Sequence, residues 1–348
     1  MGAEHPRTFV VPVSLALGEQ YRRSGEAVLS AIVVGYEAAQ RMHVAAASAL
    51  YSNGFRAVPA IGVFGAAAAA SVLSGLDTRQ FANALNFAAN MAGGVSEGFG
   101  EGTIEDHVHA GLAARAGITA AALAGAGGET SSGTLDGADG FFSTFARSRD
   151  YDLGALTAKT AGLGIRSAWS KPFPACQANQ RTMRLIRSLQ PAGLAPAEIE
   201  RVIITRAARE YDAPGICSEP PYQNMVLALM SAKFTPIATL LGKPVTESRY
   251  FKKSFGDPDV EEVAHKTTLL TTDAGDENIT VEVVRKDGRT LTLRSAEEAH
   301  LNWDTDLEMR FEALASPRLN GATETVLDLV SSLESARYIG RLMQLVRA

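Results

Sequence analysis

The most constraining feature of this 348-residue sequence is an apolar, alanine- and glycine-rich stretch over 58–74. It reads VPAIGVFGAAAAASVLS, and at helical spacing it presents apolar groups on nearly every side. A helix with no polar face belongs in a protein core, so we expect a buried helix whose small residues allow close contacts with its neighbours. The longest uninterrupted apolar run is shorter than the roughly 20 residues of a membrane span, so no transmembrane segment is predicted.

Composition places the chain among soluble globular proteins of about two domains. Hydrophobic residues make up 46% and charged residues 20%, which excludes wholesale disorder. The net charge of −5 argues against a nucleic-acid-binding protein. Only two cysteines are present, Cys176 and Cys217, so neither a disulfide framework nor a multi-cysteine metal site is predicted. The opening residues MGAEHPRTFV lack the features of a signal peptide, and we expect a cytoplasmic protein.

The first half of the chain is predicted to be helical. Apolar residues recur every three or four positions in AVLSAIVVGYEAAQRM, over 27–42. Gly75 is expected to end the 58–74 helix, and Asp77 to cap the next one, over 78–94. The other predictions for this half are a helix over about 109–124 and glycine-rich loops over 93–102 and 125–140.

The second half changes character. β-branched residues predict a strand over 199–206, and alternation around Lys286-Asp287-Gly288 predicts a hairpin over 278–294. The remaining predictions are a strand over 267–272 and helices over 222–232 and about 322–346.

This order predicts a mainly α protein with an inserted α+β domain. The helical domain would be built from both chain ends, over 1–165 and 313–348, and the smaller lid domain would span 166–312. We expect the binding site in a cleft between them.

Two loops contain candidate site residues. In the first, Glu105, Asp106, His107 and His109 could ligate zinc, but no partner pair at metal-site spacing accompanies them, and no metal site is predicted. His107 and His109 would point about 200° apart on a helix, so only one would face a given pocket. The glycines over 93–102 match neither a phosphate-binding loop nor a dinucleotide fingerprint, and they predict a mobile or tightly turning loop.

The second loop is SKPFPAC, in which two prolines flank Lys171. A lysine there could bind a carboxylate or shuttle a proton, or it could be a surface residue between domains. Cys176 is either a buried thiol or a nucleophile, and Tyr211 either packs or acts as an acid. His5, at the chain start, would ordinarily be frayed. These residues alone do not identify a reaction.

Six blocks, in one order along the chain, carry a family resemblance. They are His5-Pro6 with VVPVSLAL, AIVVGYEAAQRM, GFRAVPAIGVFGAAAAASVLSGLD, the loop from Glu101 to Gly111, the stretch from Leu135 to Phe145, and KPFPAC ending at Cys176. Together they resemble the MmgE/PrpD family, which includes 2-methylcitrate dehydratase, cis-aconitate decarboxylase and iminodisuccinate epimerase.

The resemblance implies a helical domain with an inserted lid, usually as a homodimer, and a cofactor-free site for small di- or tricarboxylates. It implies that Lys171 and His5 bind carboxylates or transfer the proton, and that Tyr211 donates or relays it. His109 would contact substrate or hold the glycine loop. The other predicted substrate-binding residues are Arg56, Asp106, His107 and Cys176.

Four departures from the family pattern bear on activity. The helical stretch that usually precedes His-Pro is not in this sequence, so either the start is truncated or the protein lacks part of the usual site and helical core. Arg56-Ala57 replaces a usual His-Pro, and Asp106 replaces a usual lysine. A carboxylate at 106 would repel an anionic substrate unless Arg56 or His107 compensates. Cys176 replaces a histidine of the decarboxylase-like members, which weakens a decarboxylase interpretation.

Three functions follow from the sequence. The leading hypothesis is a lyase of the 2-methylcitrate dehydratase type, acting on a small hydroxy-carboxylate by proton abstraction next to a carboxylate. The alternative is an epimerase or isomerase that returns the same proton. The third is an incomplete, non-catalytic homologue.

Overall fold

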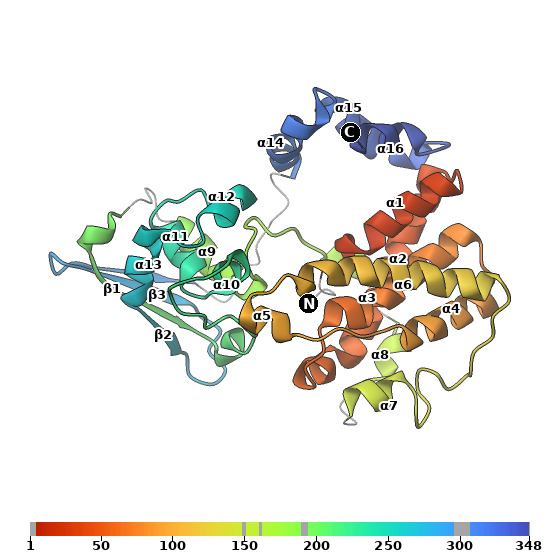
Figure 1. Ribbon diagram of the computed structural model, residues 1–348, viewed down its shortest axis with the longest axis horizontal. Helices are drawn as coiled ribbons and strands as arrows, with labels where there is room; N and C mark the ends of the chain where they lie inside the picture. Colours follow the sequence, from red (N-terminus) through yellow and green to blue (C-terminus); the bar gives the residue numbers. More distant parts are fainter. Residues whose placement is uncertain (1–4, 148–150, 160–161, 189–193, 296–306, 348) are drawn as a thin grey trace. The chain divides into compact units, whose positions relative to one another are not determined.

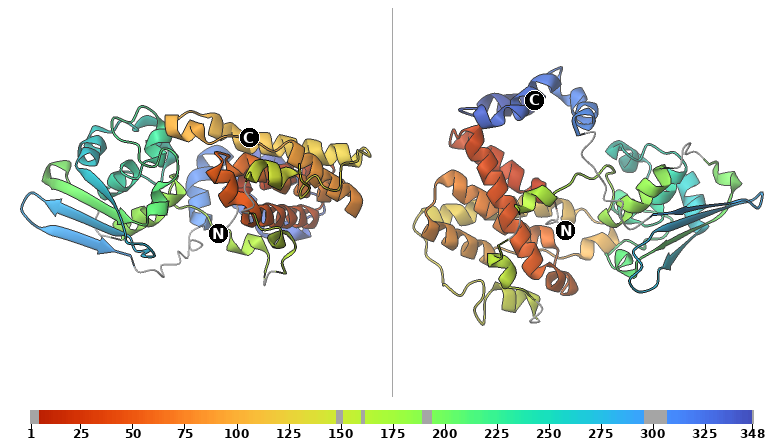
Figure 2. Two further views of the ribbon diagram at one scale, coloured as in Figure 1. Left: turned by 90° about the horizontal axis from the view of Figure 1, so that it is seen from below. Right: turned by 180° about the vertical axis from the view of Figure 1, so that it is seen from behind.

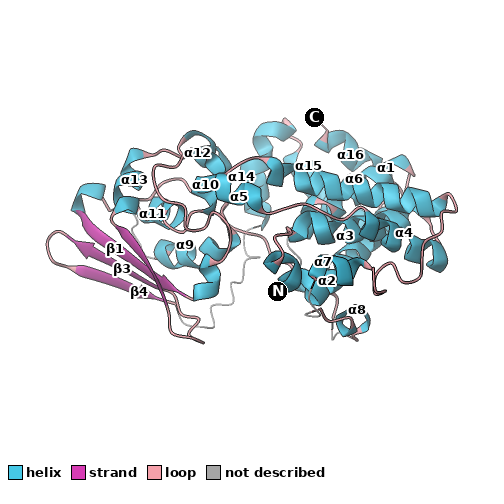
Figure 3. Ribbon diagram, turned by 60° about the horizontal axis from the view of Figure 1, so that its bottom comes forward, coloured by secondary structure: helices cyan, strands magenta, loops and turns pink. Residues whose placement is uncertain are grey.

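Helices dominate the structure, and a four-stranded sheet in the described residues comes from the middle of the chain (Figure 1, Figure 3). The computed structural model describes residues 5–147, 151–159, 162–188, 194–295 and 307–347. The predicted class, mainly α with an α+β insertion, is confirmed. The chain divides into two compact units, the first comprising Met1–Val95, Glu105–Ala168 and Asp306–Ala348 and the second Ser96–Ile104 and Trp169–Thr305.

The first unit is built around the apolar helix α3 (Ala57–Ser74), as predicted. It packs against α1 (Val10–Gln20), α2 (Gly25–Ser52), α4 (Thr78–Asn90) and α6 (Glu105–Gly125). By length and hydropathy α3 could cross a membrane, the one such helix in the described part of the chain, but 89% of it is buried inside the protein. Its place in this core accounts for its composition. The shorter helices of the unit are η1 (Pro6–Thr8), α7 (Phe141–Ala146), α8 (Gly154–Thr157) and η2 (Gly164–Ser167).

Local signals set the ends of these helices. Asp77 caps α4 in a capping box with Gln80, in which each side chain accepts from the other residue's backbone N–H. Gly75 ends α3 in the left-handed region, at φ 69°, where glycine is favoured. Both ends agree with the sequence prediction.

The C-terminal segment of the first unit differs from prediction. One helix was expected over about 322–346, but the structure has α15 (Thr323–Ser331), η6 (Leu333–Ser335) and α16 (Gly340–Val346), preceded by α14 (Leu307–Leu319). The break has a tertiary cause. Just after η6 the carbonyl of Ala336 accepts a hydrogen bond from Gly25 N at 2.8 Å, and buried Leu333 packs into the core.

The second unit contains a mixed sheet in the order β2-β1-β3-β4. The strand β1 (Ile199–Arg206) runs parallel to β2 (Thr267–Thr271) and antiparallel to β3 (Thr280–Arg285), which pairs with β4 (Thr290–Arg294). The strands predicted over 199–206 and 267–272 and the hairpin predicted over 278–294 are confirmed. Helices gather against one face of the sheet (Figure 2). They include α9 (Gln180–Arg187), α11 (Phe234–Leu240) and α13 (Pro258–His265). The helix α12 (Ser248–Lys253) belongs to the same unit and packs against α10 (Met225–Met230).

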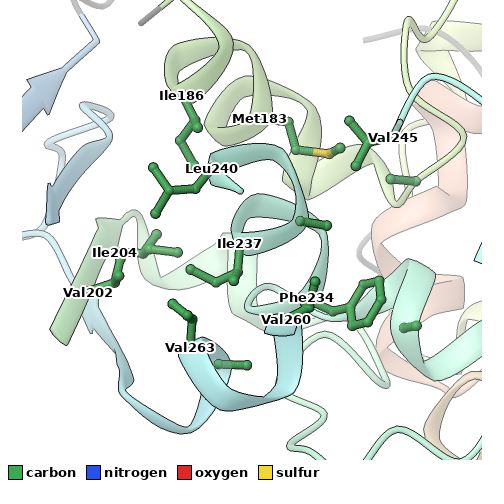
Figure 4. Packing of buried hydrophobic residues seen from close by; sticks show 14 of the residues in the cluster. Met183, Ile186, Val202, Ile204, Phe234, Ile237, Leu240, Val245, Val260 and Val263 are labelled. Atoms are coloured by element: carbon green, nitrogen blue, oxygen red, sulfur yellow. The ribbon is translucent and has the colours of Figure 1, made fainter. Parts of the chain in front are cut away.

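Strand periodicity decides which residues enter this core. Val202 and Ile204 of β1 are fully buried and face Ile237 of α11 and Val263 of α13 (Figure 4). Side chains alternate across a strand, so Arg206, two residues after Ile204, lies on the same buried face.

Two details of the second unit depart from prediction. The segment 96–104, assigned from the sequence to the helical domain, belongs to this unit and contains α5 (Glu97–Glu101). It is joined there by Asn224, whose Nδ2 donates to the carbonyl of Glu101 at 3.4 Å. The helix expected over 222–232 is shorter, α10 (Met225–Met230), because the Asn224 side chain caps it by accepting from Leu227 N.

Candidate functional site

The predicted site residues are distributed over both units. The side chain of Asp106, in α6, lies outside the part of the chain that the structure describes. The first unit carries His5, Arg56, His107 and His109, and the second carries Lys171, Cys176 and Tyr211.

Half-buried Lys171 begins a turn whose shape is held by a buried glutamine. Gln180 Oε1 accepts from Phe173 N at 3.3 Å, and its Nε2 donates to the carbonyls of Phe173 and Ala175 at 3.0 and 3.1 Å. A side-chain amide can both donate and accept, so it satisfies a turn whose two prolines supply no N–H groups. Lys171 therefore projects from a defined backbone.

The end of this turn is tied to the last residues of α10 and to Ser231, which follows that helix. Cys176, a half-buried free thiol, donates its backbone N–H to the carbonyl of Leu229 at 3.0 Å. Asn179 is fully buried, and its Nδ2 donates to the carbonyls of Met230 and Ser231, both at 2.9 Å. These bonds fix Cys176 and Asn179 within the second unit.

Tyr211 ends the short helix η5 (Ala208–Tyr211) and bridges two strands. Its hydroxyl lies 3.2 Å from the carbonyl of Ile204 in β1 and 3.3 Å from that of Leu270 in β2. Burial raises the pKa of Tyr211 to about 12, so the phenol keeps its proton at neutral pH. It can donate a proton to a leaving group, but it is not a general base.

Arg206, a fully buried arginine at the end of β1, is not among the residues predicted from the sequence. Its Nη1 donates to the carbonyl of Ala178 and to Oδ1 of Asn179, both at 3.0 Å, and its Nη2 donates to the carbonyl of Glu210 at 3.3 Å. Its guanidinium carbon lies 4.2 Å from the centre of the Tyr211 ring. Arg206 thus contacts both segments that carry second-unit site residues.

The alternation of side chains along IERVIITR could have identified Arg206 as buried. Arg206 lies at the next position on the buried face of the strand, two residues after Ile204. Beside it, burial raises the pKa of the Glu210 carboxyl, and the positive charges of Arg206 and Arg181 oppose that rise. Arg206 Nε and Glu210 Oε2 are 3.8 Å apart.

In the first unit, Arg56 and His109 come together around Gly94. Arg56 precedes α3 and donates its backbone N–H to the carbonyl of Gly94 at 3.1 Å. Gly94 has φ 97°, and a Cβ there would lie 2.3 Å from Cγ of Pro59 and 3.5 Å from Nε2 of His109. Only glycine fits, and the loop passes directly over buried His109.

The other two histidines are placed differently. His5 has a left-handed backbone, at φ 54°, and its carbonyl accepts from the backbone N and the hydroxyl of Thr8 at 2.9 and 2.7 Å. His107 is exposed on α6 while His109 is 6% exposed, as predicted for two residues that point to different sides of a helix. His109 is the one of the pair that lies at the glycine loop.

The segment that contains α3 also matches a known family in sequence. Residues 2–154 match the sequence model of the MmgE/PrpD N-terminal domain. The chain carries an MmgE/PrpD domain. The family resemblance predicted from the ordered blocks is thereby confirmed.

Similarity to known proteins extends well beyond that domain. Mouse cis-aconitate decarboxylase is 27% identical, over 99% of this chain and 74% of its own length. Human cis-aconitate decarboxylase is 28% identical, over 95% of this chain and 72% of its own. The domain match ends before Lys171, Cys176 and Tyr211, the predicted site residues of the second unit. The mouse relative's match covers nearly all of the chain.

A Tyr211→Phe substitution tests the contact of the Tyr211 hydroxyl with carbonyl groups of β1 and β2. We expect a loss of about 0.5–1.5 kcal/mol in the free energy of unfolding, because the hydroxyl's bonds to two carbonyls are removed. The unfolded tyrosine loses its proton near its ordinary pKa of 10, while the folded one keeps it to about 12. Stability therefore falls as pH rises through this window, and the variant should lose less stability there.

Urea unfolding at pH 8, 10 and 11 measures both effects. Tyr21→Phe is the control, because Tyr21 is 43% exposed and its loss should change little. Equal alkaline losses in wild type and Tyr211→Phe would contradict the prediction.

Proposed function

We propose that this chain is a cofactor-independent lyase of the dehydratase type, which removes water from a small hydroxy-di- or tricarboxylate. The observation that carries the proposal is the match of 99% of the chain to an enzyme named for acting on cis-aconitate, a tricarboxylate. Dehydration beside a carboxylate requires a cation for the substrate carboxylates, a base for the carbon-bound proton and a donor for the leaving hydroxyl.

Two residues of the second unit can serve as the cation or base and as the proton donor. Lys171 stands on a turn fixed by Gln180, which suits either a carboxylate contact or a proton transfer that needs defined geometry. Tyr211 is a neutral phenol and suits the donor role. We assign His5 as the further carboxylate-binding or proton-transferring group, as the family resemblance implies.

Decarboxylation is the second candidate, and the names of both relatives favour it. Such an enzyme would release carbon dioxide and return a proton to the carbon. The histidine that the resemblance places in decarboxylase-like members is Cys176 here, and Arg56 also departs from the family pattern. Dehydration therefore remains the first proposal.

The test is proton NMR in deuterated water with 2-methylcitrate, citrate, cis-aconitate and aspartate- or succinate-derived acids. We expect loss of the C–H signal beside a carboxylate, together with a new alkene signal from elimination of water. Exchange without elimination would favour an epimerase, and release of carbon dioxide a decarboxylase. No exchange with any of these acids, in a preparation shown to be folded, would contradict the proposal and favour a non-catalytic homologue.

A further inference from the structure

A buried arginine joins the two segments of the second unit on which predicted site residues lie. The first is the turn from Lys171 to Asn179, and the second is η5, which ends at Tyr211. Arg206 lies between them at the end of β1, paired in register with Thr271 of β2. Its side chain is therefore anchored on the sheet and donates to both segments.

The contacts use the shape of the guanidinium group and not only its charge. Nη1 donates to two acceptors on the turn, Nη2 donates to one on η5, and the group lies 4.2 Å from the centre of the Tyr211 ring. A lysine ammonium is a compact point charge and cannot reproduce this planar fork or stack on the ring. Burying a charge is costly, and an apolar residue would be a common way to fill such a core position.

We infer that Arg206 is a positioning residue, which holds the Lys171 turn and Tyr211 in one fixed arrangement. The inference rests on the proposed function, because Lys171 and Tyr211 are site residues only if the chain is that enzyme. Arg206 itself is fully buried, and the inference does not require it to contact substrate. A shift of about 1 Å in groups that it holds can lower a rate about 100-fold.

The thiol of Cys176 gives a readout that needs no substrate. It lies in the turn, and the other cysteine, Cys217, can be removed as Cys217→Ser. In that background we expect Arg206→Lys to raise the rate of Cys176 modification by a disulfide reagent about tenfold, measured well below the melting temperature. Arg201→Lys is the matched control, because Arg201 lies on the same strand but is exposed.

Activity is measured with whichever acid of the NMR panel exchanges fastest. Arg206→Lys should lower kcat about 10- to 100-fold and change KM less than threefold, and Arg201→Lys should change neither. If Arg206→Lys does not fold, Asn179→Ala removes one of the two turn-side acceptors instead and should give the same two changes.

The outcomes separate this inference from the proposed function. An unchanged rate of Cys176 modification in Arg206→Lys overturns the claim that Arg206 orders the turn, whatever the activity. A faster thiol rate with an unchanged kcat overturns the positioning role and makes Arg206 purely structural. If the wild type exchanges none of the acids, the proposed function fails and the positioning role fails with it, while the thiol rate still decides whether Arg206 orders the turn.

Discussion

Replacing Lys171 with alanine should lower turnover at least about 100-fold while changing the melting temperature by less than about 2 °C. Removal of a general acid–base group typically costs 10²–10⁴ in rate, and loss of a carboxylate-binding cation has a comparable effect. The fold should tolerate the change, because Lys171 is half-buried and Gln180 holds the turn through backbone groups. Deuterium exchange and thermal unfolding measure the two quantities.

A second substitution separates the two roles proposed for Lys171. Lys171→Arg keeps a positive charge but cannot serve as a base at neutral pH. If Lys171 only binds a carboxylate, this variant should recover part of the activity, mainly with a raised KM. If Lys171 transfers the proton, it should be as inactive as Lys171→Ala.

The control for both variants is Lys252→Ala, an exposed lysine at the end of α12 in the same unit. It should leave activity and melting temperature unchanged. Retained activity in Lys171→Ala would remove Lys171 from the site, and a large loss of stability would give it a structural role.

Gly117→Ala should destabilise the first unit by about 1–3 kcal/mol, as overpacking of a tight core does. A Cβ on Gly117, in α6, would lie 2.4 Å from Cβ of Ala66 and 2.6 Å from the backbone N of Ala67. These atoms belong to α3, so the two helices would have to separate. The higher helix propensity of alanine, about 1 kcal/mol, offsets only part of this cost.

Gly111→Ala in the same helix is the control. A Cβ at Gly111 would meet no atom within 4 Å, so this variant gains the propensity without the clash. It should be equally stable or up to about 1 kcal/mol more stable than the wild type. Denaturant unfolding of both variants measures the difference, and effects of the same sign and size would contradict the close packing of α3 and α6.

The candidate site was predictable from the sequence only through the family resemblance. Lys171, His109 and Tyr211 came from the resemblance, since a lone lysine, histidine or tyrosine has an ordinary structural explanation. Arg206 was not predicted, because it donates hydrogen bonds to acceptors that lie 4 to 28 residues away along the chain. Only the folded arrangement brings them to one guanidinium group.

The sequence by itself determined the features that depend on neighbouring residues. The all-round apolar composition of α3 required a buried helix, the Asp77–Gln80 pair set a helix start, and alternation around Gly288 specified the hairpin. These signals are local, because side-chain periodicity, caps and tight turns act within a few residues.

Tertiary structure decided the features in which distant segments satisfy each other. The C-terminal helix is broken where the carbonyl of Ala336 pairs with Gly25, more than 300 residues earlier in the chain. The segment around Glu101 joins the second unit through Asn224. No local pattern encodes such pairings, because a buried backbone group takes whichever partner the fold brings to it.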